Sequence, residues 1–136
     1  MQRRETVLLV DDDPQVLELA RELLELEGYR VLKANSGEKA LEIADGHPEP
    51  IALLLADVVM PGLSGPDVAA RLRPLRPSTK VLYMSGFASS AVAARGVQSG
   101  DPLVFKPFRP EALLRKVREV LDPRSPFARR PEPPSR

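Results

Sequence analysis

The sequence predicts an α/β protein: a single, doubly wound, five-stranded parallel sheet with helices on both faces. Two observations carry this prediction. Short apolar runs alternate along the chain with segments of helical period, and parallel strands require such crossover connections. Runs that are apolar almost throughout are typical of strands buried on both faces. The clearest runs are Val7–Val10, Ile51–Ala56, Val81–Met84 and Leu103–Phe105.

The first predicted helix follows the run at Val7–Val10. We expect it over Pro14–Glu27, because its apolar residues recur on one helical face while most of its charges fall elsewhere. Asp13 is the expected N-cap, with Pro14 at the first helical position. Gly28 then ends the helix in the manner of a C′ glycine.

The middle of the chain continues the alternation. A short strand over Tyr29–Ala34 precedes a helix over Gly37–Asp45, and the second buried run precedes a helix that Ser64 opens. The spacing of Ser64 and Asp67 is that of a capping box. Two prolines, at positions 74 and 77, end this helix.

The last third holds two more strand–helix pairs and a tail. We expect a short helix over Ser89–Arg95 and a clear amphipathic helix over Pro110–Leu121. Residues 1–122 are therefore predicted to be one domain. Residues 123–136 are rich in proline and arginine, have little apolar surface to bury, and are predicted to be a disordered tail.

Composition excludes several classes of function. The 136 residues include 20 basic and 19 acidic side chains, so the net charge of +1 gives no reason to expect nucleic acid as a partner. The absence of cysteine excludes disulfides, zinc–thiolate sites and thiol catalysis. No apolar stretch approaches the length of a membrane span, so we expect a cytoplasmic protein with no membrane association.

Each of the four buried runs leads into a residue that can carry chemistry. Asp11 and Asp12 follow the first run, Asp57 the second, Ser85 the third and Lys106 the fourth. In open α/β sheets, ligands bind beyond the carboxyl ends of the strands, so we expect these side chains to gather at one edge.

A group of carboxylates and one ammonium at a sheet edge suits phosphoryl transfer. Three neighbouring carboxylates repel one another unless a cation joins them, and Mg²⁺ prefers such oxygen ligands. A carboxylate can also attack phosphorus and form an acyl phosphate. Lys106 and the metal could then supply positive charge, and the Ser85 hydroxyl could hydrogen-bond a phosphoryl oxygen. His47, the only histidine, lies between Gly46 and Pro48 and is expected to be a solvated loop residue.

The motifs at these strand ends resemble a known family. They are Val7–Pro14, Asp57–Gly65, Met84–Gly86 and Phe105–Phe108. Over about Thr6–Asp122 the chain resembles the receiver domain of response regulators in bacterial two-component signalling. It is also similar to the receivers of hybrid sensor histidine kinases. The resemblance implies the flavodoxin-like (βα)5 receiver fold.

The resemblance also implies a role for each site residue. Asp57 would be the phosphoacceptor. The implied Mg²⁺ ligands are Asp11, Asp12, Asp57 and the backbone carbonyl of Val59. Ser85 and Lys106 would contact the phosphoryl group.

Two further positions follow from the same resemblance. Three residues before the lysine, many receivers carry an aromatic switch residue, and here that position is Leu103. The peptide bond between Lys106 and Pro107 is implied to be cis.

The function so implied is phosphorelay signalling rather than enzymatic turnover. The chain would accept a phosphoryl group from a histidine kinase or phosphotransfer protein, and would alter its binding of a downstream protein target. Its own chemistry would be limited to self-phosphotransfer and self-dephosphorylation. We expect a monomer or a weak dimer.

Two alternatives remain open from the sequence. A haloacid-dehalogenase-type phosphatase would use Asp11 as nucleophile, since Asp11 and Asp13 match its opening signature. That fold needs a further acidic pair after the lysine, and it gives Asp57 no role. A degenerate receiver that only binds protein is the other alternative, and the presence of every expected site residue argues against it.

Overall fold

The computed structural model describes residues 5–86, 96–98 and 100–122. Its elements, in chain order, are β1 (Thr6–Val10), α1 (Pro14–Leu26), β2 (Arg30–Ala34), α2 (Gly37–Gly46), β3 (Leu53–Asp57), α3 (Gly65–Leu72), β4 (Lys80–Ser85), β5 (Leu103–Phe105) and α5 (Pro110–Leu121). The expected helix over 89–95 and the expected tail over 123–136 lie outside the described residues. Within them, no helix is long and apolar enough to cross a membrane.

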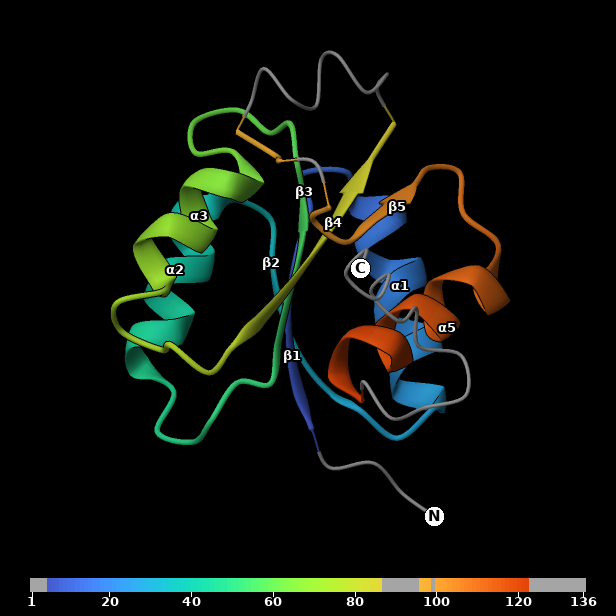
Figure 1. The fold of residues 1–136 in the computed structure, drawn as a ribbon, viewed down its shortest axis with the longest axis horizontal. Helices are drawn as coiled ribbons and strands as arrows, with labels where there is room; N and C mark the ends of the chain where they lie inside the picture. Colours follow the sequence, from blue (N-terminus) through green and yellow to red (C-terminus); the bar gives the residue numbers. More distant parts are fainter. Residues whose placement is uncertain (1–4, 87–95, 99, 123–136) are drawn as a thin grey trace, which may run out of the picture.

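The five strands form one parallel sheet in the order β2-β1-β3-β4-β5. Helices α2 and α3 lie against one face of the sheet, and α1 and α5 lie against the other (Figure 1). The predicted doubly wound α/β fold is thereby confirmed.

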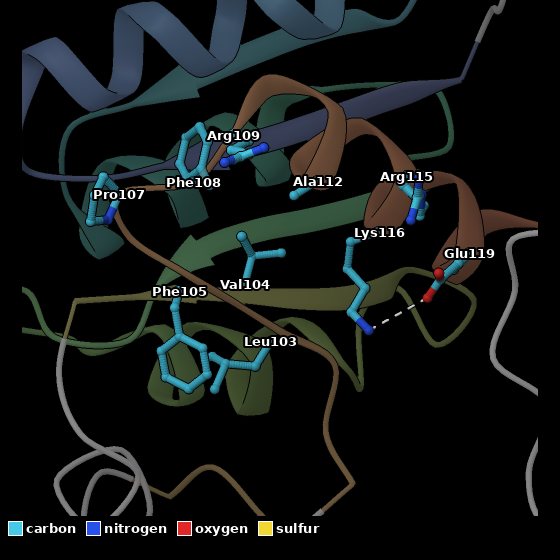
Figure 2. A pocket seen from close by; sticks show the side chains of 10 residues that line it. All are labelled: Leu103, Val104, Phe105, Pro107, Phe108, Arg109, Ala112, Arg115, Lys116 and Glu119. Atoms are coloured by element: carbon cyan, nitrogen blue, oxygen red, sulfur yellow. Dashed lines mark hydrogen bonds and ion pairs between the residues drawn. The ribbon is translucent and has the colours of Figure 1, made fainter.

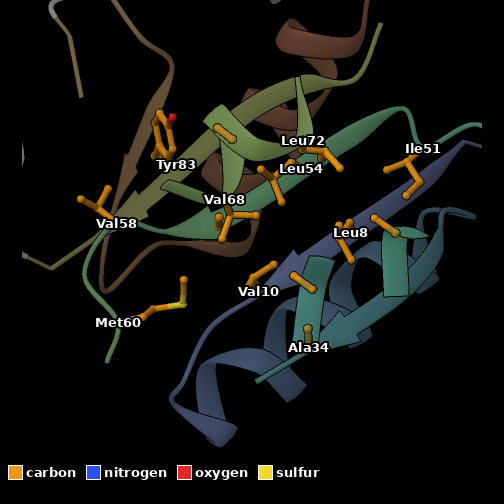
Figure 3. Packing of buried hydrophobic residues seen from close by; sticks show 14 of the residues in the cluster. Leu8, Val10, Ala34, Ile51, Leu54, Val58, Met60, Val68, Leu72 and Tyr83 are labelled. Atoms are coloured by element: carbon orange, nitrogen blue, oxygen red, sulfur yellow. The ribbon is translucent and has the colours of Figure 1, made fainter. Parts of the chain in front are cut away.

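Strand β1 shows why the sheet is covered twice. All five of its residues are buried. Because successive side chains of a strand point to opposite faces, Leu8 and Val10 pack with α2 and α3, whereas Val7 and Leu9 pack with α1 and α5. Figure 3 shows the first of these two clusters. The apolar run at the start of the sequence therefore serves two separate cores.

The predicted helix starts have the expected capping interactions. The Asp13 side chain accepts a hydrogen bond from the Gln15 amide at 2.9 Å. Ser64 and Asp67 form the full capping box, with distances of 3.2 and 3.0 Å. Gly28 has a φ of 95°, which fits its predicted place after α1.

Two local expectations need correction. Strand β3 begins at Leu53 rather than at residue 51, and Asp57 is its last residue rather than the first residue after it. His47 is half-buried rather than solvated, and its Nε2 is buried with no hydrogen-bond partner among the described residues. The reason is that Arg76 binds the carbonyl of His47 and holds this loop against the end of α3.

Candidate functional site

The predicted residues meet at the carboxyl edge of the sheet. Because Val10 pairs in register with Ala56, Asp11 and Asp57 follow on neighbouring strands at the same level. Lys106 comes directly after β5, two strands away from β3. The parallel topology therefore brings together side chains that lie up to 95 positions apart in the sequence.

Three carboxylates form the centre of the site. Asp11, Asp12 and Asp57 each offer an oxygen, and these oxygens all lie within 4.8 Å of one another. Asp11 is fully buried and Asp57 is 5% exposed, whereas Asp12 is open to solvent. Oxygen donors this close, with one side facing water, fit a hard divalent cation that keeps some of its water ligands.

Lys106 lies inside this acidic group. Its Nζ is 2.9 Å from Asp11 Oδ2 and 3.4 Å from Asp57 Oδ2. The other oxygen of Asp11 accepts a hydrogen bond from the Asp13 amide at 2.9 Å. Asp11 is thus fixed at both oxygens.

Burial and mutual repulsion shift the pKa values of these groups. Burial raises the pKa of Asp57 to about 6, and the nearby charge of Asp11 adds to the rise while Lys106 opposes it. Burial also raises the pKa of Asp11, although the Asp13 amide and Lys106 partly offset it. For Lys106, burial alone would lower the pKa, but the hydrogen bond and charge of Asp11 and the charge of Asp57 outweigh it and raise the pKa.

Ser85 lies beside the lysine at the same edge. It is the last residue of β4, it is buried, and its carbonyl accepts a hydrogen bond of 2.7 Å from the Lys106 amide. The peptide bond between Lys106 and Pro107 is cis, as the resemblance implies. Because Lys106 directly follows β5, this strand joins the site to the surface around the exposed Phe105.

Leu103 opens β5 and is partly buried against the cluster under α2 and α3. Figure 2 shows it close to Phe105, whose side chain is 51% exposed. Leu103 and Phe105 line a surface hollow, to which α5 contributes Arg115 and Lys116. Lys116 pairs with Glu119 at 3.4 Å. Leu103 thus borders an exposed, partly aromatic surface.

The structure also shows a contact that the sequence analysis missed. A Cβ atom on Gly65 would lie 2.5 Å from the carbonyl oxygen of Asp57, so only glycine fits there. The Gly65 amide donates a hydrogen bond of 3.1 Å to the Val58 carbonyl. The start of α3 at Gly65 therefore packs directly against the backbone of Asp57. It belongs to a quoted motif, but a motif alone gives no physical reason for the glycine.

A parallel five-stranded sheet with a buried acidic group and a lysine at its carboxyl edge is the architecture of two-component receivers. The family model of the response regulator receiver domain matches residues 7–118 of this chain. The chain therefore belongs to the response regulator receiver family, and it is a receiver domain of phosphorelay signalling.

Named relatives agree with this assignment. The chain is 38% identical over 116 residues to the transcriptional regulatory protein CpxR of Escherichia coli K12, covering 85% of this chain and 48% of CpxR. It is 36% identical over 119 residues to the sensor kinase CckA of Brucella abortus, covering 86% of this chain and 12% of that kinase. The chain thus spans about half of the regulator, and much less of the kinase.

Solved structures show the same fold. A CheY-like receiver domain from Methanospirillum hungatei has a TM-score of 0.78 and 31% identity, covering 89% of this chain and 96% of that one. The receiver domain of the hybrid histidine kinase CckA has a TM-score of 0.73 and 32% identity, covering 86% of this chain and 99% of that one.

The phosphatase alternative finds no support. The matched family and the structures above are receivers. Asp13, the second acid of the phosphatase signature, caps α1 and is not one of the three clustered carboxylates.

Proposed function

We propose that Asp57 accepts a phosphoryl group from a phosphohistidine on a partner histidine kinase or phosphotransfer protein. The observation that supports this most directly is the placement of Lys106 between Asp11 and Asp57, with Nζ at 2.9 and 3.4 Å from their oxygens. A lysine at this position can pair with the Asp57 carboxylate before the transfer and with the phosphoryl group after it. The pKa near 6 leaves Asp57 mostly ionised at neutral pH, so it can act as a nucleophile.

The donor set supports Mg²⁺ as the cofactor. The three clustered carboxylates would hold it, and water would complete its shell. The Val59 carbonyl is the further ligand that the family resemblance implies. Bound there, the ion would supply positive charge beside the phosphoryl oxygens.

The chain's own residues then perform the transfer. An oxygen of Asp57 forms a bond to phosphorus, the N–P bond of the phosphohistidine breaks, and the imidazole leaves with the electron pair. Lys106 remains beside the acidic group and pairs with the new phosphoryl charge. The Ser85 hydroxyl hydrogen-bonds one phosphoryl oxygen. We expect no catalysis beyond this step and the later hydrolysis of the acyl phosphate.

The surface that we propose to change its partner binding on phosphorylation is formed by β5 and α5. Ser85 and Lys106 are joined by a backbone hydrogen bond, and Lys106 directly follows the exposed Phe105. A change at the phosphoryl site therefore has a short route to the surface in Figure 2, where we propose that a downstream protein binds. We expect the chain to act in the cytoplasm, as a monomer or weak dimer.

The test is phosphorylation by acetyl phosphate, with intact-protein mass spectrometry as the readout. We expect a gain of one phosphoryl group that requires Mg²⁺, and complete loss of that gain in Asp57→Asn. The matched control is Asp45→Asn, an exposed carboxylate on α2, which should behave as wild type. Peptide mapping that placed the label on Asp11, or an Asp57→Asn variant that still gained it, would refute the proposal.

A further inference from the structure

The loop between β3 and α3 lies directly against the start of α2. Gly37 is the first residue of α2 and is buried. A Cβ atom there would lie 2.7 Å from Leu63 Cβ, 2.8 Å from Val68 Cγ2 and 3.2 Å from the Leu63 carbonyl oxygen. The first two distances are shorter than real Cβ atoms show. The helix therefore reaches the loop closely only because its first residue has no side chain.

Two further contacts hold the same loop. Gly62 has a φ of +77°, and a Cβ atom on it would lie 2.8 Å from Glu38 Oε2, so the side chain next to Gly37 covers the loop. Met60 is 7% exposed and belongs to the cluster that also holds Val10 and Val68 (Figure 3). Three of the four loop residues from 60 to 63 thus contact α2 or the core beneath it.

The held segment includes a residue that the proposed function uses. Val59 lies between Asp57 at the end of β3 and the buried Met60. On the β3 side the chain is fixed as well, because the Val58 amide donates to the Met84 carbonyl at 2.8 Å. The backbone at Val59 is therefore placed by both ends of a short segment.

We propose that the first turn of α2, through Gly37 and Glu38, is a platform that positions the loop between β3 and α3. We call this loop the metal-ligand loop, because it carries Val59. The platform fixes the Val59 carbonyl relative to the carboxylates, which matters because Mg²⁺ accepts little departure from octahedral geometry. This inference rests on the proposed function. Gly37 and Glu38 are positioning residues, since neither belongs to the clustered carboxylates.

The test compares two glycine-to-alanine substitutions in one helix. Gly37→Ala must push α2 and the loop apart, whereas a Cβ atom on Gly46, the last residue of α2, meets nothing within 4 Å. Calorimetric titration of the metal-free proteins with MgCl₂ should show Mg²⁺ binding about tenfold weaker in Gly37→Ala, and within about twofold of wild type in Gly46→Ala. The Mg²⁺ concentration for half-maximal phosphorylation should shift by the same factor. The rate at saturating Mg²⁺ should recover, which a general loss of folded protein would not allow.

A second variant covers the case in which Gly37→Ala does not fold. Gly62→Ala places a side chain at a φ of +77° in an exposed part of the loop, which strains the loop backbone. It should therefore weaken Mg²⁺ binding in the same direction. Folded Gly37→Ala or Gly62→Ala proteins that bind Mg²⁺ as tightly as Gly46→Ala would overturn the platform. If wild type binds Mg²⁺ but is not phosphorylated on Asp57, the proposed function fails, while the Mg²⁺ titrations still decide the platform. If wild type binds no Mg²⁺, both fail.

Discussion

At the scale of single residues, the site is a charge imbalance that folding creates. Asp11, Asp12 and Asp57 bring three negative charges together, and Lys106 supplies one positive charge. Two negative charges therefore remain beside a low-dielectric interior. A divalent cation balances that charge, so the metal-free protein should be less stable whenever these carboxyls are ionised.

The pH dependence of stability follows from the raised pKa of Asp57. The unfolded value is near 3.8 and the folded value about 6, so between these pH values the folded state binds more protons and the free energy of unfolding falls as pH rises. A shift of this size corresponds to about 3 kcal/mol. Urea unfolding of the metal-free protein should show wild type losing stability relative to Asp57→Asn between about pH 4 and pH 7, with little further change above.

The comparison with Asp57→Asn isolates this carboxyl from the others. The raised pKa of Asp11 acts in the same direction and is present in both proteins, because burial is its largest cause. Parallel pH profiles for the two proteins would mean that burial does not hold Asp57 partly protonated.

At the scale of elements, each described helix begins where the sequence places a suitable cap or proline. Helix α1 begins with Pro14 after the Asp13 cap, and α3 begins within a capping box. Such caps satisfy amides that have no partner within the helix. The caps of α1 and α3 and the proposed phosphoryl site lie at the same carboxyl edge of the sheet, but they use different acids.

Asp13 offers a test of that separation. Asp13→Ala should lower the free energy of unfolding by about 1 kcal/mol, because the Gln15 amide loses its acceptor, and phosphorylation at saturating Mg²⁺ should continue. Asp13→Asn keeps a capping oxygen and is the matched control, with stability close to that of wild type. Urea unfolding and the mass-spectrometric assay measure the two effects. Loss of phosphorylation in a folded Asp13→Ala protein would show that Asp13 takes part in the chemistry.

The sequence predicts elements better than it predicts contacts between them. The strands could be identified because β1 and β3 are buried on both faces and are therefore apolar apart from Thr6 at the start of β1 and Asp57 at the end of β3. The site could be located because the carboxyl ends of parallel strands share an edge. The fit of Gly37 against Leu63 could not be predicted, because it depends on where α2 crosses a loop 26 positions away.

At the scale of the whole molecule, the two edges of the sheet differ in their effect on stability. The carboxyl edge holds the buried charges that cost stability. At the opposite edge, Arg76 Nη1 donates to the Glu49 carbonyl at 2.9 Å, and its Nη2 donates to the carbonyls of Ala44 and His47 at 2.9 and 2.5 Å. One guanidinium thus ties the end of α3 to the end of α2 and to the loop that leads into β3.

Replacing this arginine should lower stability without changing the chemistry. Arg76→Met keeps much of the apolar stem but removes three charged hydrogen bonds, and among the described residues only the Ala44 carbonyl keeps another donor, the His47 amide at 3.4 Å. We expect a cost of about 2 kcal/mol. Arg71→Met, at an exposed position on α3, is the matched control and should change the free energy of unfolding by less than about 0.5 kcal/mol. Urea unfolding measures both. The Mg²⁺ concentration for half-maximal phosphorylation should stay at its wild-type value in each, since the clustered carboxylates and the loop between β3 and α3 lie at the other edge. A folded Arg76→Met protein with weakened Mg²⁺ dependence would show instead that the two edges are coupled through α2.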